Sequence, residues 1–226
     1  MKISTLCLVL AGIVAASAAS ADTIKLASVS PLSGSQAGLG EMIKLGAQLA
    51  VEEAAPWFKE QGIELVFSPQ DDQASPDVGV ATARRLVNDK EVLGVIGHLN
   101  SGVAIPSSEV YKEYDLTMVS PANTNPQITE RRYANVNRIC GRDDVQGPVG
   151  AEFAVNELGA KKIFIVHDKT TYGQGVAEAF KARAQELGAQ IVGFDGTEEL
   201  SNFHSFTMRM KVMKPDVVYF GGIYDR

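Results

Sequence analysis

The chain has 226 residues, a formal net charge of −6 at pH 7, 45% hydrophobic residues and two cysteines. A mildly acidic sequence without a basic stripe lacks the charge that phosphate binding requires, which argues against nucleic acid as a partner. After residue 21, charged residues interrupt every hydrophobic segment before it reaches the roughly 20 apolar residues of a transmembrane helix, so we expect this part to be soluble.

The first 21 residues have the order of a secretory signal peptide. Lys2 supplies a positive charge, an apolar run extends from residue 6 to residue 16, and Ala19-Ser20-Ala21 is an A-x-A-like cleavage site. We therefore predict cleavage near Ala21. Cys7 would be lost with the signal, and Cys140 would then have no partner for an intramolecular disulfide.

Alternating strands and helices are predicted between residues 22 and 140. Short apolar runs predict strands over residues 23–29, 64–67, 92–96, 116–119 and 136–139. Helical spacing predicts helices over residues 43–54 and 103–114, and Ser75-Pro76 predicts the N-cap and first residue of another. Such β-α units are typical of a parallel sheet flanked by helices.

The same pattern restarts after a polar break at residues 141–144. It predicts helices over residues 145–158, 175–187 and 203–213, and strands over residues 163–166, 190–194 and 217–220. Gly159 and Gly188 follow predicted helix ends, where glycine suits a left-handed C-terminal cap. No helix follows the last predicted strand before Arg226, so we expect the second lobe to be incomplete.

The sequence therefore predicts an α/β protein with two Rossmann-like lobes, each a parallel sheet flanked by helices. Residues 1–21 are the predicted signal peptide, residues 22–140 the N-terminal ligand-binding lobe, and residues 141–226 a partial second lobe.

Loops after the predicted strands carry small hydroxylated residues and glycines. Ligands of open parallel sheets bind at these loops, where helix N-termini present free N–H groups. Ser101, at a predicted helix start, suits a carboxylate, while the Ala122 carbonyl and the Thr124 hydroxyl suit an ammonium group. Together they predict a site for a zwitterion.

Each of these residues also has a structural explanation that the sequence leaves open. Ser101 fits a helix N-cap equally well, and Thr124 belongs to an Asn-Thr-Asn-Pro segment typical of turns. Tyr172 fits the wall of a ligand cleft, but an isolated tyrosine also packs its ring and keeps its hydroxyl in water.

Catalytic and metal sites find little support in the sequence. His98, His167 and His204 show no metal-ligand spacing, and no G-x-S-x-G nucleophile motif occurs. Asp71 and Asp72 are adjacent on a predicted loop and are interpreted as solvated acids rather than an acid/base pair. We therefore predict no enzymatic activity, no metal and no cofactor.

Several loop motifs occur in one register across nearly the whole chain after residue 21. They are Pro31-Leu32-Ser33-Gly34, Asp71-Asp72, Ile96-Gly97-His98-Leu99-Asn100-Ser101, Ser120-Pro121-Ala122, His167-Asp168-Lys169-x-x-Tyr172-Gly173-x-Gly175 and Tyr219-Phe220-Gly221-Gly222. With these motifs the chain resembles the leucine/isoleucine/valine-binding proteins of bacterial ABC transporters. The resemblance implies a monomeric, two-lobed, hinged clamp in the periplasm, which hands an amino acid to the membrane subunits of an ABC permease.

The resemblance also implies roles for individual residues. Ser101 would bind the ligand carboxylate, Ala122 and Thr124 would contact its amino and carboxylate ends, and Tyr172 would line the side-chain pocket. The full set of predicted ligand-binding residues is Ser101, Ala122, Thr124, Tyr172, Leu99, Asn100, Asn123, Leu39 and Ile223.

At several positions the chain departs from the family pattern. Leu39 replaces a tyrosine or tryptophan, and Ile223 replaces a tyrosine, although Tyr224 is adjacent. The two positions of the family's disulfide are Ala74 and Asn100, and the acid expected to hold the ligand ammonium would lie beyond Arg226.

The expected function is capture of an amino acid, with a branched-chain amino acid as the default ligand, by an extracytoplasmic solute-binding protein. The alternative is an amino-acid- or amide-sensing receptor or regulatory domain built on the same clamp. An exported α/β enzyme dependent on Ser101 is a third interpretation. We expect the 226-residue chain by itself to bind poorly.

Overall fold

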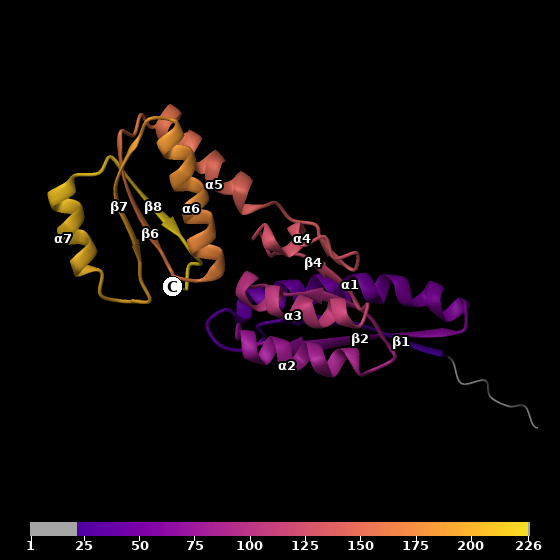
Figure 1. The fold of residues 1–226 in the computed structure, drawn as a ribbon. Helices are drawn as coiled ribbons and strands as arrows, with labels where there is room; N and C mark the ends of the chain where they lie inside the picture. Colours follow the sequence, from indigo (N-terminus) through magenta and orange to yellow (C-terminus); the bar gives the residue numbers. More distant parts are fainter. Residues whose placement is uncertain (1–21, 226) are drawn as a thin grey trace, which may run out of the picture.

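The computed structural model describes residues 22–225, which form two α/β lobes side by side (Figure 1). The predicted signal peptide and its cleavage site lie outside the described residues. No helix within residues 22–225 is long and apolar enough to cross a membrane.

The first lobe contains a five-stranded parallel sheet in the order β2-β1-β3-β4-β5. Its strands are β1 (Asp22–Ser30), β2 (Ile63–Asp71), β3 (Val92–Gly97), β4 (Thr117–Ser120) and β5 (Val136–Arg138). The order changes direction between β1 and β3, and the loops at such a switch point diverge to leave room for a ligand.

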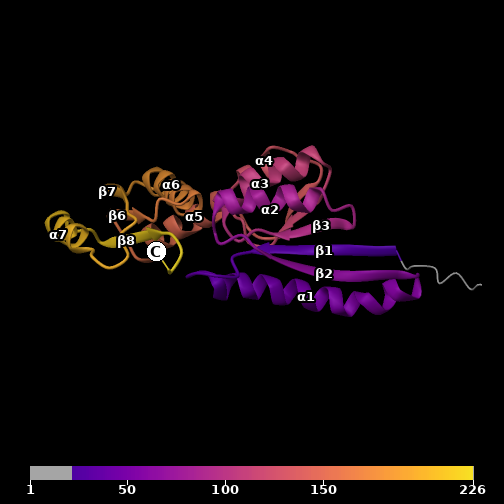
Figure 2. The ribbon, with the colours of Figure 1, turned by 90° about the horizontal axis from the view of Figure 1, so that it is seen from below.

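Helices cover both faces of this sheet, as a parallel sheet with two apolar faces requires. Helix α1 (Ala37–Glu60) lies on one face, while α2 (Pro76–Val87), α3 (Ser101–Glu113) and the short α4 (Gln127–Glu130) lie on the other (Figure 2). Ala27, Val29, Met118 and Tyr111 are fully buried between these layers, and strands β1, β3, β4 and β5 all contribute to one continuous core.

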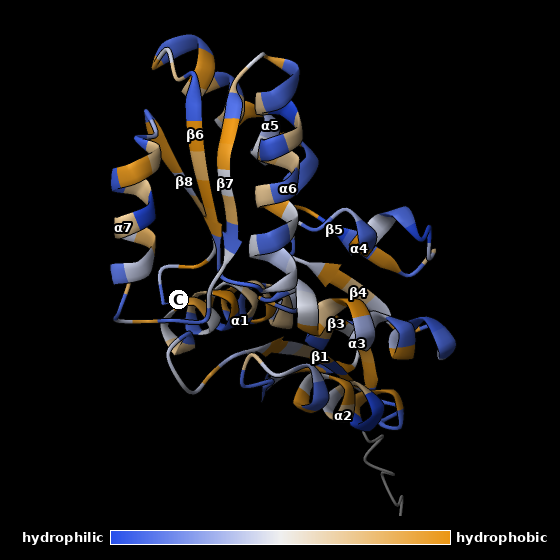
Figure 3. Cartoon of the chain, turned by 60° about the vertical axis from the view of Figure 1, so that its left-hand side comes forward, coloured by the Kyte–Doolittle hydropathy of each residue, from blue (hydrophilic) through white to orange (hydrophobic). Residues whose placement is uncertain are grey.

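The second lobe is smaller. Its parallel sheet has the order β7-β6-β8, with β6 (Lys162–His167), β7 (Gln190–Gly196) and β8 (Val217–Gly221). Helix α5 (Asp143–Glu152) and α6 (Thr171–Glu186) lie on one face, and α7 (His204–Met213) lies on the other (Figure 1). The π-helical turn η1 (Phe153–Glu157) continues α5. Apolar residues run along β6 and β7 between the helices (Figure 3), and Ile163, Ile165 and Phe180 form the core.

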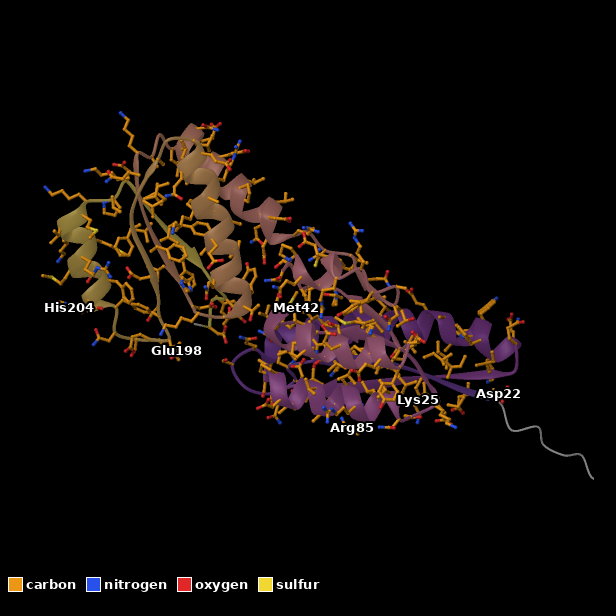
Figure 4. The ribbon with its side chains drawn as sticks, viewed as in Figure 1. Asp22, Lys25, Met42, Arg85, Glu198 and His204 are labelled. Atoms are coloured by element: carbon orange, nitrogen blue, oxygen red, sulfur yellow. The ribbon has the colours of Figure 1, made fainter. Side chains whose placement is uncertain are left out.

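The carboxyl ends of the strands in the first lobe are turned toward the second lobe. Asp22 opens β1 at the outer end of the molecule, whereas Met42, near the start of α1, lies at the end beside the second lobe (Figure 4). The loops that follow β1, β3 and β4 therefore face the loops that follow β6 and β8.

The predicted α/β class with parallel sheets is confirmed, and so are the helix caps at Gly159 and Gly188, whose φ angles are 67° and 88°. The predicted first helix was too short. Helix α1 extends over residues 37–60, and it carries apolar residues such as Met42 and Leu45 on its exposed face, which blurs the helical pattern in the sequence.

One predicted helix start is confirmed and another needs correction. Ser75 is the N-cap of α2 and Pro76 its first residue, although the Ser75 side chain makes no capping hydrogen bond and only its carbonyl oxygen accepts, from the Gly79 N–H over 2.9 Å. Helix α6 begins at Thr171 rather than Gly175, because the Thr170 hydroxyl accepts a hydrogen bond from the Gly173 N–H over 2.9 Å and caps the helix there.

Candidate functional site

A small cavity lies between the two lobes, at the carboxyl ends of their strands. Its volume is about 180 Å³, well below the roughly 300–1,000 Å³ of pockets for drug-sized molecules, and therefore suited to a small ligand. It is lined by Leu39, Leu99, Asn100, Ser101, Ala122, Thr124, Tyr172 and Ile223. These are eight of the nine residues predicted from sequence as ligand-binding.

Ser101 is the first residue of α3 and is 2% exposed. The N-cap position belongs to Asn100, whose carbonyl oxygen accepts hydrogen bonds from the N–H groups of Val103 and Ala104. The capping explanation for Ser101 therefore does not hold. Because the first N–H groups of a helix lack intrahelical acceptors and carry partial positive charge, this end of α3 suits a carboxylate.

Thr124 and Ala122 belong to the loop that follows β4. The Thr124 hydroxyl oxygen is buried and has no hydrogen-bonding partner within residues 22–225. Its carbonyl oxygen accepts a hydrogen bond from the Asp143 N–H over 2.9 Å, which fixes the loop against the crossing to the second lobe. A buried hydroxyl without a protein partner, at a cavity wall, is suited to a polar ligand atom.

Asn123 does not line the cavity, in contrast to its predicted role as a ligand-binding residue. It is fully buried behind the cavity, where its carboxamide oxygen accepts from the Ser120 hydroxyl over 2.6 Å and from the His98 N–H over 3.2 Å. Its amide nitrogen donates to the Leu99 carbonyl oxygen over 2.8 Å. All of its side-chain polar atoms are engaged, and they join the loop after β3 to the end of β4.

Asp72 and His98 form a buried contact that the sequence analysis did not identify. Asp72 was predicted to be solvated, but it is fully buried, and its carboxylate lies 2.8 Å from His98 Nδ1. His98 Nε2 lies 3.2 Å from the Tyr111 hydroxyl, and burial raises the pKa of Tyr111. The correction has a structural cause, because both Asp72 and His98 immediately follow strands and meet at one edge of the sheet.

The apolar walls of the cavity come from both lobes. Leu39 lies in the first turn of α1, which packs so closely on the preceding loop that a Cβ at Gly40 would lie 1.8 Å from the Pro31 carbonyl oxygen. Glycine is therefore required there. Tyr172 lies in the first turn of α6, and Ile223 follows β8.

The Asp168 carboxylate binds Thr170, the N-cap of the helix that carries Tyr172, and Ile223. It is buried, and one oxygen accepts from the Thr170 N–H over 2.9 Å and from the Thr170 hydroxyl over 2.6 Å. The other oxygen accepts from the Ile223 N–H over 3.2 Å. One carboxylate thus joins the loop after β6 to the loop after β8.

Polar side chains also join the two lobes beside the cavity. The Ser35 hydroxyl donates to Asp225 over 2.6 Å, and the Gln36 amide donates to the same carboxylate over 3.3 Å. Asn100 then donates to the Gln36 carboxamide oxygen over 2.8 Å. The cavity is thus bordered by a chain of hydrogen bonds from the second lobe to the start of α3.

Within residues 22–225 no group of three or more His, Cys, Asp and Glu side chains is arranged to hold a metal ion. The polar atoms at the cavity are hydroxyl, carboxamide and backbone groups, which suit binding and orientation of a small polar molecule.

Two parallel α/β lobes with a small cavity between the carboxyl ends of their strands define a two-lobed ligand-binding fold. The sequence profile of the family described as "Periplasmic binding protein" matches residues 23–225. The chain belongs to this family, which confirms the resemblance drawn from its loop motifs. The family is one of solute-binding proteins.

Curated relatives carry names that agree with this assignment. The chain is 39% identical over 226 residues to a "Leu/Ile/Val-binding protein homolog 2" of Brucella abortus, covering 99% of this chain and 61% of the relative. It is 41% identical over 197 residues to an "Amino acid binding protein" of Pseudomonas aeruginosa, covering 86% of this chain and 52% of the relative. The chain thus spans about half the length of the curated relatives it matches.

Solved structures show the same fold. A leucine binding protein from Thermotoga maritima aligns with a TM-score of 0.79 at 28% identity, over 87% of this chain and 55% of that one. An ABC transporter substrate-binding protein from Desulfitobacterium hafniense, in complex with Leu, aligns with a TM-score of 0.68 at 27% identity, over 87% of this chain and 58% of that one.

Proposed function

We propose that this protein captures an amino acid, with a branched-chain amino acid as the first candidate, as the solute-binding component of an ABC transporter. The observation that carries the proposal is the cavity between the lobes, where Ser101 and Thr124 lie beside apolar walls. The names of the relatives support the same ligand class.

The geometry suits the two charged ends of an amino acid. The carboxylate is bound at the start of α3 by the Ser101 hydroxyl and the first N–H groups of the helix. The ammonium group is bound by the Ala122 carbonyl oxygen and by the Thr124 hydroxyl, which has no partner within residues 22–225. These opposite requirements orient the ligand in the cavity.

The side chain of the ligand lies against the apolar walls formed by Leu39, Tyr172 and Ile223. Burial contributes about 0.8 kcal/mol per methylene group, so a branched aliphatic side chain adds substantially to the affinity. Leu39 and Ile223 replace larger aromatic residues expected from the family pattern, and they leave room for ligand side chains of different shape.

Closure of the two lobes over the ligand and delivery to permease subunits complete the proposed function. Hinge closure is an established motion of two-lobed binding proteins. The proposed location is the periplasm, reached through the signal peptide predicted over residues 1–21, and the proposed state is a monomer. The boundaries of the lobes remain as proposed from the sequence, at residues 140 and 141.

Isothermal calorimetry of the full-length gene product against the twenty amino acids tests this function. We expect saturable binding with preference for leucine, isoleucine or valine. Ser101→Ala should weaken binding about tenfold, the effect of losing one hydrogen bond to a charged group.

The matched control is Ser205→Ala, an exposed serine on α7 in the second lobe, which should bind as the unsubstituted protein does. Absence of binding to every amino acid would reject the proposed function.

A further inference from the structure

A buried carboxylate lies at the crossing between the lobes, outside the set of residues that line the cavity. Asp143, the first residue of α5, is 1% exposed, and neither of its carboxylate oxygens has a hydrogen-bonding partner within residues 22–225. An acid in the first turn of a helix is favoured by the helix dipole, but that effect does not require burial. Buried carboxylates are ordinarily paired, so this one requires another explanation.

Both lobes contribute to the surroundings of Asp143. Its N–H is bonded to the Thr124 carbonyl oxygen, and the Thr124 hydroxyl is also buried and without a partner within residues 22–225. On the second-lobe side, a Cβ built at Gly175 would be 3.8 Å from Asp143 Oδ2. Thr124 lines the cavity and Asp143 does not, so Asp143 lies behind Thr124.

The charges around Asp143 favour a hydrogen bond from Thr124. Burial raises the pKa of Asp143, the Thr124 hydroxyl and the Arg138 guanidinium lower it, and the Asp144 charge raises it. Arg138 itself donates to the carbonyl oxygens of Asn123 and Asn125. Of these two donors, the Thr124 hydroxyl is the one that remains uncommitted.

We propose that Asp143 is a positioning residue for the ammonium end of the ligand, because its carboxylate accepts a hydrogen bond from the Thr124 hydroxyl and thereby turns the lone pairs of the Thr124 oxygen toward the cavity. The inference rests on the proposed function, since it requires a ligand with an ammonium group. A hydroxyl has one donor and two acceptor sites. Once the donor is engaged by Asp143, the cavity side of Thr124 offers only acceptors.

This arrangement distinguishes an ammonium group from other polar groups. An ammonium has only donors and is satisfied by the Thr124 oxygen, whereas a carbonyl or carboxylate finds no donor there. The negative charge behind Thr124 attracts a cation further, because the site is poorly solvated and charges are weakly screened in it. Asp143 should therefore govern selectivity for ligands with an amino group.

The test compares leucine with isocaproate, which has the carbon skeleton of leucine without the amino group, on the full-length gene product. Calorimetry measures both dissociation constants, and the compared quantity is their ratio, the dissociation constant of isocaproate divided by that of leucine. Asp143→Asn should weaken leucine binding about tenfold and leave isocaproate binding unchanged, because the carboxamide lacks the charge and can donate to the Thr124 oxygen.

Three further variants separate this role from a structural one. Asp144→Asn is the matched control, because Asp144 is the adjacent acid and is exposed and paired with Arg142. The ratio of dissociation constants measured for this variant should equal that of the unsubstituted protein. Thr124→Val should lower the ratio as much as Asp143→Asn does, and the double variant should lower it no further. Thr124→Ser keeps the hydroxyl and should retain the original ratio.

An equal loss of both ligands in Asp143→Asn, or additive effects in the double variant, would overturn the inference and leave the proposed function intact. If Asp143→Asn does not fold, the test rests on the two variants Thr124→Val and Thr124→Ser. An unchanged ratio of dissociation constants in Thr124→Val would then overturn the inference. If the unsubstituted protein binds no amino acid at all, the proposed function fails and the inference fails with it.

Discussion

His98 supports the loop that carries Ser101 from inside the first lobe. Its two ring nitrogens contact Asp72 and Tyr111, and its N–H donates to Asn123, so one residue connects four segments beneath the cavity. Removing one partner of a buried hydrogen-bonded pair leaves the other group without a partner in an environment that solvates it poorly. The stability of the site therefore depends on this buried contact.

His98→Ala should lower the free energy of unfolding by about 3 kcal/mol or more, because it leaves the Asp72 carboxylate buried without its partner. Urea unfolding followed by circular dichroism measures the change. His204→Ala is the control, an exposed histidine at the start of α7 that should change stability by less than about 0.5 kcal/mol. A loss in His98→Ala as small as that of the control would contradict the prediction.

At the scale of elements, the start of α6 is held by close backbone packing. A Cβ at Gly173 would lie 2.1 Å from Asp168 Oδ1 and 2.5 Å from the Gly221 carbonyl oxygen. The helix can therefore approach β8 only with glycine at this position. Tyr172 and Ile223 reach the cavity because the loops that carry them are packed together in this way.

Gly173→Ala should separate the start of α6 from β8, displace Tyr172 and weaken amino-acid binding, together with a loss of about 2 kcal/mol of stability, since overpacking costs roughly 1–3 kcal/mol. Thermal unfolding and calorimetry measure both effects. Gly46→Ala is the matched control. Gly46 lies within α1, and a Cβ built there would have no atom within 4 Å. It should stabilise the protein by about 0.5–1 kcal/mol. Unchanged binding in Gly173→Ala would refute the prediction.

At the scale of the whole molecule, the lobes are joined by the crossing near residues 139–142 and by side chains at the cavity. Asp225 binds Ser35 and Gln36, and Asn125 donates to the Thr171 carbonyl oxygen over 3.4 Å. These contacts are few, which suits two lobes that move relative to each other as rigid bodies.

Asp225→Ala should shift the lobes toward a more separated arrangement and weaken ligand binding roughly fivefold, because it removes two hydrogen bonds that net about 1 kcal/mol at a partly exposed position. Small-angle X-ray scattering reports the separation as an increased radius of gyration in the absence of ligand. Glu64→Ala, an exposed acid on β2, should change neither quantity. An identical scattering curve and affinity for Asp225→Ala would show that these contacts do not hold the lobes.

Much of the fold could be predicted from local patterns. The order of strands and helices, the parallel class and the caps at Gly159 and Gly188 follow from periodicity and turn residues, which act over a few positions along the chain. The cavity residues could also be anticipated, because parallel strands bring their carboxyl ends to one edge and the loop motifs mark those ends.

Side-chain partners could not be predicted in the same way. Asp72 and Asn123 appeared as an exposed acid and a ligand contact, yet both are buried and bonded to the segment after β3. Asp143, assigned only to a polar break, is buried where the lobes meet. Contacts between residues 20 or more positions apart depend on strand order and on how the lobes pack, and no local pattern records either of these.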